Sequence, residues 1–152
     1  NKQALVAYPT EYVDDVDEYY KGKLVTGCVM LDSLPQLVDA NGEWDYVIDD
    51  LLRHVFDETG LVFMAVCLGG SALSSPTKGG LTYMELMSLV PQHGLQHMLI
   101  FASGNDLYHW GQISKWSDDW STAALALCDH AHAVANNVLF GFWCVCNCMA
   151  LR

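Results

Sequence analysis

The sequence predicts a three-layer α/β fold, in which helices cover both faces of a mostly parallel sheet. Two observations carry this prediction. Apolar, strand-like runs alternate with helical patterns along the chain, and those runs lack the polar alternation of half-exposed strands. Continuous apolar strands are typical of parallel sheets that are covered on both faces. Helices between successive strands imply right-handed crossovers, which keep the strands parallel.

We assign this fold to residues 23–152 as one domain. Residues 1–22 are acidic and rich in tyrosine, which predicts an N-terminal extension at the surface. An acidic docking motif is the alternative interpretation of this segment.

Four strands are predicted, over residues 23–31, 61–68, 97–102 and 137–146. Each is a short apolar run bounded by glycine, proline or polar residues. In the common doubly wound order 2-1-3-4, the first strand lies between the second and the third. The ligand crevice of such sheets opens at the carboxyl ends of the first and third strands.

Three helices connect these strands. The clearest covers residues 44–58, where apolar residues recur at helical spacing and form one stripe: Trp44, Val47, Ile48, Leu51, Leu52, Val55 and Phe56. A second covers residues 81–90 and ends before Pro91. A third begins at Ser117 or Asp118 and continues through an alanine-rich stretch to about residue 135.

Composition excludes several classes of function. The chain has 152 residues, of which 52% are hydrophobic and 16% charged, so it can bury a sizeable core. Its net charge is −11 with only 7 lysines and arginines, which disfavours nucleic acids and anionic membranes as partners. No apolar run predicts a membrane span, and localisation is left open.

The six cysteines indicate thiols rather than a disulfide scaffold. Cys28 and Cys67 lie in apolar strands, where a small buried thiol is usual. A metal cluster is the alternative for the alternating cysteines at positions 144, 146 and 148 together with Cys128, His130 and His132. Since Cys-x-Cys-x-Cys is not a zinc spacing, we predict no metal site, and we predict no cofactor.

Three of the strands end in loops that offer reactive groups. Residues 31–34 place a hydroxyl beside a carboxylate, residues 67–71 offer backbone amides, and residues 103–106 offer a side-chain amide. The strand order brings these loops together at one edge of the sheet. Taken singly, each loop is explained by turn formation. Taken together, they predict a shared site.

Acyl transfer is the chemistry that these groups suit. It needs a nucleophile, a base and donors for a developing oxyanion. Ser33 is the candidate nucleophile, and its own amide would be one donor. The amide of Gly69 or Gly70 and the side chain of Asn105 would be the others, because an asparagine NH₂ donates without titrating.

These blocks resemble those of the SGNH/GDSL hydrolases, a flavodoxin-like family of esterases, lipases and deacetylases. The first block, Gly-Asp-Ser-Leu, corresponds to residues 31–34, with Leu31 in place of the glycine. The second is a glycine after strand 2, here Gly69 or Gly70, and the third corresponds to residues 103–106. The intervals from 33 to 69 and from 69 to 105 are equal, and each accommodates one helix and one strand.

The resemblance implies that Ser33 is the nucleophile and that Gly69 and Asn105 are oxyanion donors. The family also carries Asp-x-x-His after a fifth strand, which supplies the base and its orienting carboxylate. Residues 129–132 have that pattern, but they fall inside the predicted third helix, and we interpret the match as chance. His109 is the candidate base, with packing against its aromatic neighbours as the alternative. We therefore expect a truncated or degenerate member of the family, or one part of a longer protein.

The predicted function is a serine-dependent ester hydrolase or deacylase that acts on a small acyl ester. The alternative is a non-catalytic α/β binding or interaction domain that kept the fold and lost the histidine. A nucleotide-binding domain is disfavoured because residues 69–80 contain neither glycine-rich phosphate motif. The edge of the fourth strand predicts a homodimer or a partner chain.

Overall fold

The computed structural model describes residues 5–7, 25–32, 36–38, 44–46, 48–77, 79–102, 105–106 and 113–142. Most of the predicted extension 1–22 and the end of the predicted fourth strand, 143–146, lie outside these ranges. Within the predicted extension, residues Leu5–Ala7 form strand β1. This strand pairs antiparallel with β5 (Phe63–Cys67), so it adds an edge strand to the main sheet.

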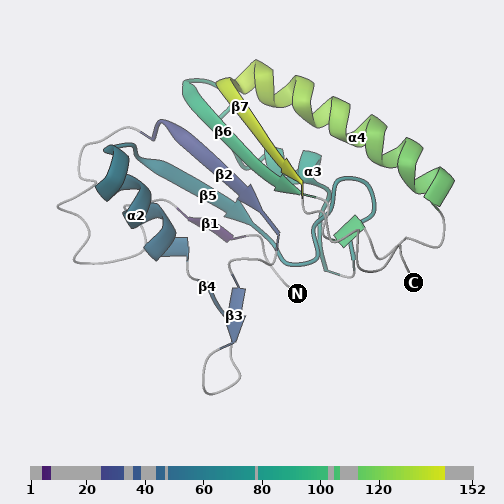
Figure 1. The fold of residues 1–152 in the computed structure, drawn as a ribbon, viewed down its shortest axis with the longest axis horizontal. Helices are drawn as coiled ribbons and strands as arrows, with labels where there is room; N and C mark the ends of the chain where they lie inside the picture. The colour runs from purple at the N-terminus through teal and green to yellow at the C-terminus, as the bar shows by residue number, and fades with distance from the viewer. Residues whose placement is uncertain are drawn as a thin grey trace.

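The main sheet has the order β1-β5-β2-β6-β7. Its four parallel strands are β2 (Gly27–Leu31), β5, β6 (Leu95–Ala102) and β7 (Ala135–Phe142). Numbered along the chain, these four strands follow the order 2-1-3-4, which confirms the prediction (Figure 1). The crossovers between them contain α2, α3 and α4.

The start of the first helix differs from the prediction. Residues Trp44–Tyr46 form strand β4, which pairs antiparallel with β3 (Gln36–Val38) in a separate two-stranded sheet. Helix α2 covers Ile48–Thr59, so the predicted helix over 44–58 is wrong in its first residues. Tryptophan and tyrosine favour strands, and pairing with β3 overrides the helical spacing of the apolar residues there.

The other two helices cover the opposite face of the sheet from α2 (Figure 1). Helix α3 (Tyr83–Met87) begins with a capping box, in which Thr82 and Glu85 each accept a hydrogen bond from the other's backbone amide. Helix α4 (Ile113–Val134) leads into β7 without an intervening residue. No helix in the described ranges is long and apolar enough to cross a bilayer.

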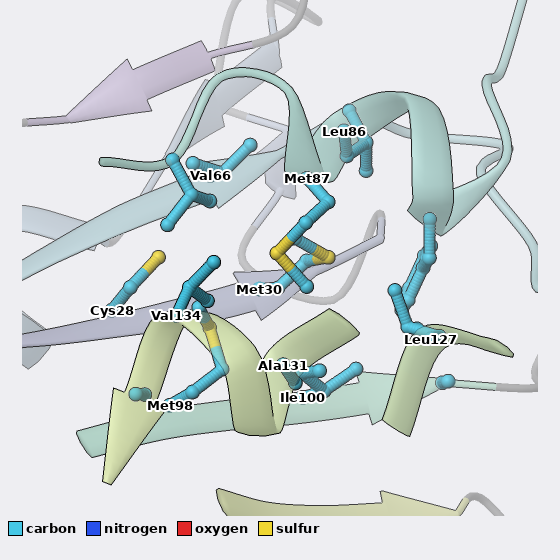
Figure 2. Packing of buried hydrophobic residues seen from close by; sticks show 14 of the residues in the cluster. Cys28, Met30, Val66, Leu86, Met87, Met98, Ile100, Leu127, Ala131 and Val134 are labelled. Atoms are coloured by element: carbon cyan, nitrogen blue, oxygen red, sulfur yellow. The ribbon is translucent and has the colours of Figure 1, made fainter. Parts of the chain in front are cut away.

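The core has two parts, as a three-layer fold requires. Alternate residues of β2, β5, β6 and β7 pack against α3 and α4, as Figure 2 shows for Met30, Val66, Ile100, Met87 and Leu127. The intervening strand residues pack against α2, through a smaller cluster. Strands β2 and β5 are buried along their whole length, which explains their continuous apolar sequence.

The buried thiol of Cys28 predicts a loss of stability in alkali. Burial raises the pKa of this thiol from 9.0 to about 12. Above pH 9 the unfolded chain loses a proton that the folded chain keeps, so stability falls as pH rises toward 12. We expect wild type to lose about 1.4 kcal/mol per pH unit more than Cys28→Ala in this window. Urea unfolding at several pH values measures the free energy of unfolding of both proteins. An equal pH dependence in wild type and Cys28→Ala would contradict the burial of the thiol.

Candidate active site

The register of the parallel strands brings their carboxyl ends to one edge. Leu31 lies beside Cys67 across the β2–β5 pair, and Met30 lies beside Ile100 across the β2–β6 pair. The residues that follow β2, β5 and β6 therefore leave the sheet at the same edge. Among the predicted site residues, Gly69 and Asn105 are described, whereas Ser33 and His109 lie outside the described residues.

Buried polar side chains gather at this edge. In the described part of the chain, they are Asp32, Ser71 and Asp106, with exposed fractions of 3%, 1% and 0%. Each follows a different strand: β2, β5 and β6, respectively. Burying a polar group costs free energy unless it is hydrogen-bonded. The other buried side chains of the described structure are apolar, so the three loops at this edge differ from the rest of the interior.

The carboxylate of Asp106 binds the loop that follows β5. Its Oδ2 accepts from the Leu73 amide at 2.9 Å, and its Oδ1 accepts from the Ser74 amide at 3.0 Å. The Ser74 hydroxyl at 3.0 Å and the Ser75 amide at 3.3 Å also donate to Oδ1. Successive backbone amides form an anion-binding concavity. Here the anion is a side chain of the protein itself.

The side chain of Asn105 reaches the same loop. Its Nδ2 donates to the Ser71 carbonyl at 2.8 Å. This bond uses one of the two hydrogens of the amide group, and no described residue accepts the other. The structure thus brings Asn105 against the loop that contains Gly69 and Gly70, as the sequence predicted for a shared site.

This loop is closed tightly on itself. The Gly70 carbonyl accepts from the Thr77 amide at 2.8 Å, and the Ser71 hydroxyl accepts from the Leu81 amide at 3.2 Å. A Cβ atom at Gly80 would overlap the Gly70 carbonyl, so only glycine fits this close approach. Gly70 itself has a positive φ of 87°. The loop after β5 is consequently a fixed turn that holds its amides in place.

The Gly69 amide is a second notable feature of this turn. Gly69 is buried, yet no described residue accepts a hydrogen bond from its N–H. Buried backbone donors are nearly always paired, so the acceptor of this amide lies outside the described residues or belongs to a bound group.

Two other side chains at this edge, Cys67 and Tyr83, are excluded as nucleophiles by their raised pKa values. Burial, with a smaller contribution from Asp32, raises the pKa of Cys67 to about 12. Burial and then the charges of Asp32 and Asp106 hold the pKa of Tyr83 well above its usual value. Both groups are therefore protonated near neutral pH. Tyr83 instead donates to the Phe101 carbonyl at 2.5 Å, which fixes the end of β6 ahead of Asn105.

Four of the five described histidines lie at the amino edge of the sheet, and the fifth, His54, is exposed on α2. His93 and His132 line a polar hollow where α4 ends and β6 begins, and His130 contacts Gln92 at 2.9 Å through Nε2. His97 stacks on Phe63 near the start of β6. The Asp-x-x-His pattern of residues 129–132 is thus at the amino edge, inside α4. The described residues contain no group of three or more His, Cys, Asp or Glu side chains that could hold a metal ion.

The sequence did not reveal the roles of Ser71 and Asp106. Ser71 was named only as part of a loop, and Asp106 only as a turn former beside Asn105. The signal that could have found Asp106 is the run Leu73–Ser75 with its serines, which offers several donors for one carboxylate. The bonds join residues more than 30 positions apart, and no local pattern encodes them.

Comparisons with known proteins do not add a function to this geometry. They found no matching protein family, no matching curated protein and no matching solved structure.

Removal of the Asp106 carboxylate should destabilise the protein strongly. Asp106→Ala leaves three backbone amides and one hydroxyl without their acceptor, and we expect a loss of about 3 kcal/mol or more. Ser74→Ala removes one of these bonds and should cost about 1 kcal/mol. Urea unfolding measures both values. The exposed Asp50→Asn is the control, expected within about 0.5 kcal/mol of wild type. A similarly small effect for Asp106→Ala would contradict the proposed importance of its bonds.

Proposed function

We propose that the chain is a serine-dependent ester hydrolase or deacylase of the SGNH/GDSL type. Ser33 would be the nucleophile, and the Gly69 amide and the Asn105 side chain would stabilise the oxyanion. His109 would be the general base. The substrate would be a small acyl ester.

The observation that carries this proposal is the pair of donors at one edge of the sheet. The buried Gly69 amide has no acceptor among the described residues, and Asn105 contacts the same turn through Ser71. Preorganised donors of this kind stabilise charge that develops in a transition state, because they need no reorganisation during the reaction. Ser33 directly follows Asp32, which lies buried at the end of the neighbouring strand.

A non-catalytic binding domain is the second candidate, and a specific observation favours it. Four of the five described histidines lie at the opposite edge of the sheet and His54 is exposed on α2, so the proposal relies on His109 as the base. A serine hydroxyl without a base is a weak nucleophile near neutral pH. The bonds of Asn105 and Asp106 to the turn would then be structural, and the donors would bind an anionic or carbonyl group without turnover.

Ester hydrolysis distinguishes the two candidates. Ser33→Ala should lower kcat for p-nitrophenyl acetate by at least about 10³-fold. Asn105→Ala should lower it by about 10²-fold because one oxyanion donor is lost. Ser88→Ala, at an exposed position at the end of α3, is the matched control and should keep the wild-type rate. Equal rates for wild type and Ser33→Ala would rule out Ser33 as nucleophile.

We also propose that two copies of the chain associate through the edge of β7. This strand pairs with β6 and with no other described strand, and Leu139 on it is 58% exposed. Open strand edges readily pair with another chain.

A charged residue on this strand should prevent the association. We expect wild type to have twice its chain mass of 16.9 kDa by light scattering, and Leu139→Lys to have the chain mass itself. Leu125→Lys, on the exposed side of α4, is the control and should leave the dimer intact. A monomeric wild type at high micromolar concentration would contradict the proposal.

A further inference from the structure

A groove lies on the α2 side of the sheet, over the amino halves of β6 and β7. Its volume is about 290 Å³. An apolar cavity of roughly 150 Å³ already binds benzene, so the groove has room for a substituted ring. Its side-chain lining is apolar at Leu61, Phe63, Leu99 and Leu139 and polar at His97 and Asn137. The groove is separate from the candidate active site, which lies at the carboxyl ends of the strands.

One wall of the groove is the aromatic ring of Phe63, which crosses β2 to reach β6. In the register of the parallel strands, Gly27 lies between Phe63 and His97. A Cβ atom at Gly27 would overlap the Phe63 ring, so glycine makes room for the ring above β2. The ring stacks on the imidazole of His97, with 6.1 Å between the centroids and 14° between the planes. On β7, Leu139 is 58% exposed and extends this apolar surface.

Hydrogen bonds fix the orientation of the two polar side chains. Asn137 lies directly opposite His97 in the β6–β7 pair. Its Nδ2 donates to the Gln96 carbonyl at 3.2 Å, and because a carbonyl oxygen only accepts, this bond orients the amide group. The same Nδ2 lies 3.4 Å from Nδ1 of His97, so Nδ1 is the acceptor of this pair. The hydrogen of the neutral imidazole is then on Nε2.

The two side chains consequently offer one donor and one acceptor. The donor is Nε2–H of His97 and the acceptor is Oδ1 of Asn137, and no described residue bonds to either atom. A carboxamide carries the complementary pair, since its oxygen accepts and its N–H donates. A carboxylate lacks the donor, and the net charge of −11 repels it. An apolar lining with a few placed polar groups is typical of small-molecule sites.

We propose that this groove binds an uncharged aromatic carboxamide. The ring of the ligand packs against Phe63, Leu99 and Leu139, where it covers exposed apolar surface. The amide group of the ligand accepts from His97 and donates to Asn137. The site is a second site of the molecule, and it does not depend on Ser33 or on the proposed hydrolase activity.

Benzamide is the probe that tests this site. Its binding to the full chain is followed by the backbone amide signals in two-dimensional NMR, which should shift at Phe63, His97 and Leu139. Benzoate, which lacks the donor, and toluene, which lacks the amide, should bind at least about fivefold more weakly. Prior substitution Ser33→Ala should leave the affinity for benzamide unchanged.

Variants of the polar pair test which groups hold the amide. Asn137→Leu should weaken benzamide binding about tenfold, because the acceptor is lost. His97→Phe keeps an aromatic ring on Phe63 but removes the donor, and it should weaken binding similarly. Asn136→Leu is the matched control and should bind as wild type, because Asn136 is equally exposed on β7 but lines a different hollow.

Two results would overturn the proposal. One is the absence of benzamide binding, or shifts confined to residues outside the groove. The other is equal affinity for benzamide, benzoate and toluene, or an equal effect of Asn137→Leu and Asn136→Leu. The NMR spectrum of each variant without ligand shows whether it is folded, so a folding defect is recognised before its affinity is compared.

Discussion

The buried carboxylate of Asp106 is the interaction on which the carboxyl edge of this fold depends. It follows β6, yet its bonds go to the loop after β5, on the far side of β2 in the sheet. Each of its oxygens accepts from a backbone amide, so among the described residues the charge is balanced by amide dipoles. This arrangement fixes the loop after β5 and brings Asn105 against Ser71.

At this edge, some polar groups are bonded within the protein, and others could bind a ligand. Both carboxylate oxygens of Asp106 accept hydrogen bonds from the loop after β5. Burial and nearby carboxylates raise the pKa values of Tyr83 and Cys67, so both groups are protonated near neutral pH. Among the described residues, no acceptor binds the Gly69 amide or the second hydrogen of the Asn105 side chain. Both are hydrogen-bond donors, and the groups around them are held by a closed turn. This combination suits a developing negative charge better than it suits a metal or a phosphate-cradling glycine loop.

The sequence predicted the layers and the strand order, because burial on both faces leaves continuous apolar runs in parallel strands. It also predicted that the loops after β5 and β6 meet, as the bond between Asn105 and Ser71 shows. It failed at residues 44–46, where aromatic residues at helical spacing pair as strand β4 instead. It could not foresee the bonds of Asp106, since they join groups that only the folded chain brings together. The strand at Leu5–Ala7 was hidden by the acidic segment that follows it.

The central claim is that the donors at the carboxyl edge serve an activated Ser33. Treatment with a fluorophosphonate, followed by peptide mass spectrometry, tests it most directly, because a base-activated serine attacks the phosphorus of the reagent, displaces fluoride and is left as a stable phosphonate ester. The account predicts one adduct, on the peptide that contains Ser33, and its loss when the protein is unfolded in urea first. No adduct, or labelling of serines without preference, would contradict the claim and leave a binding domain as the function.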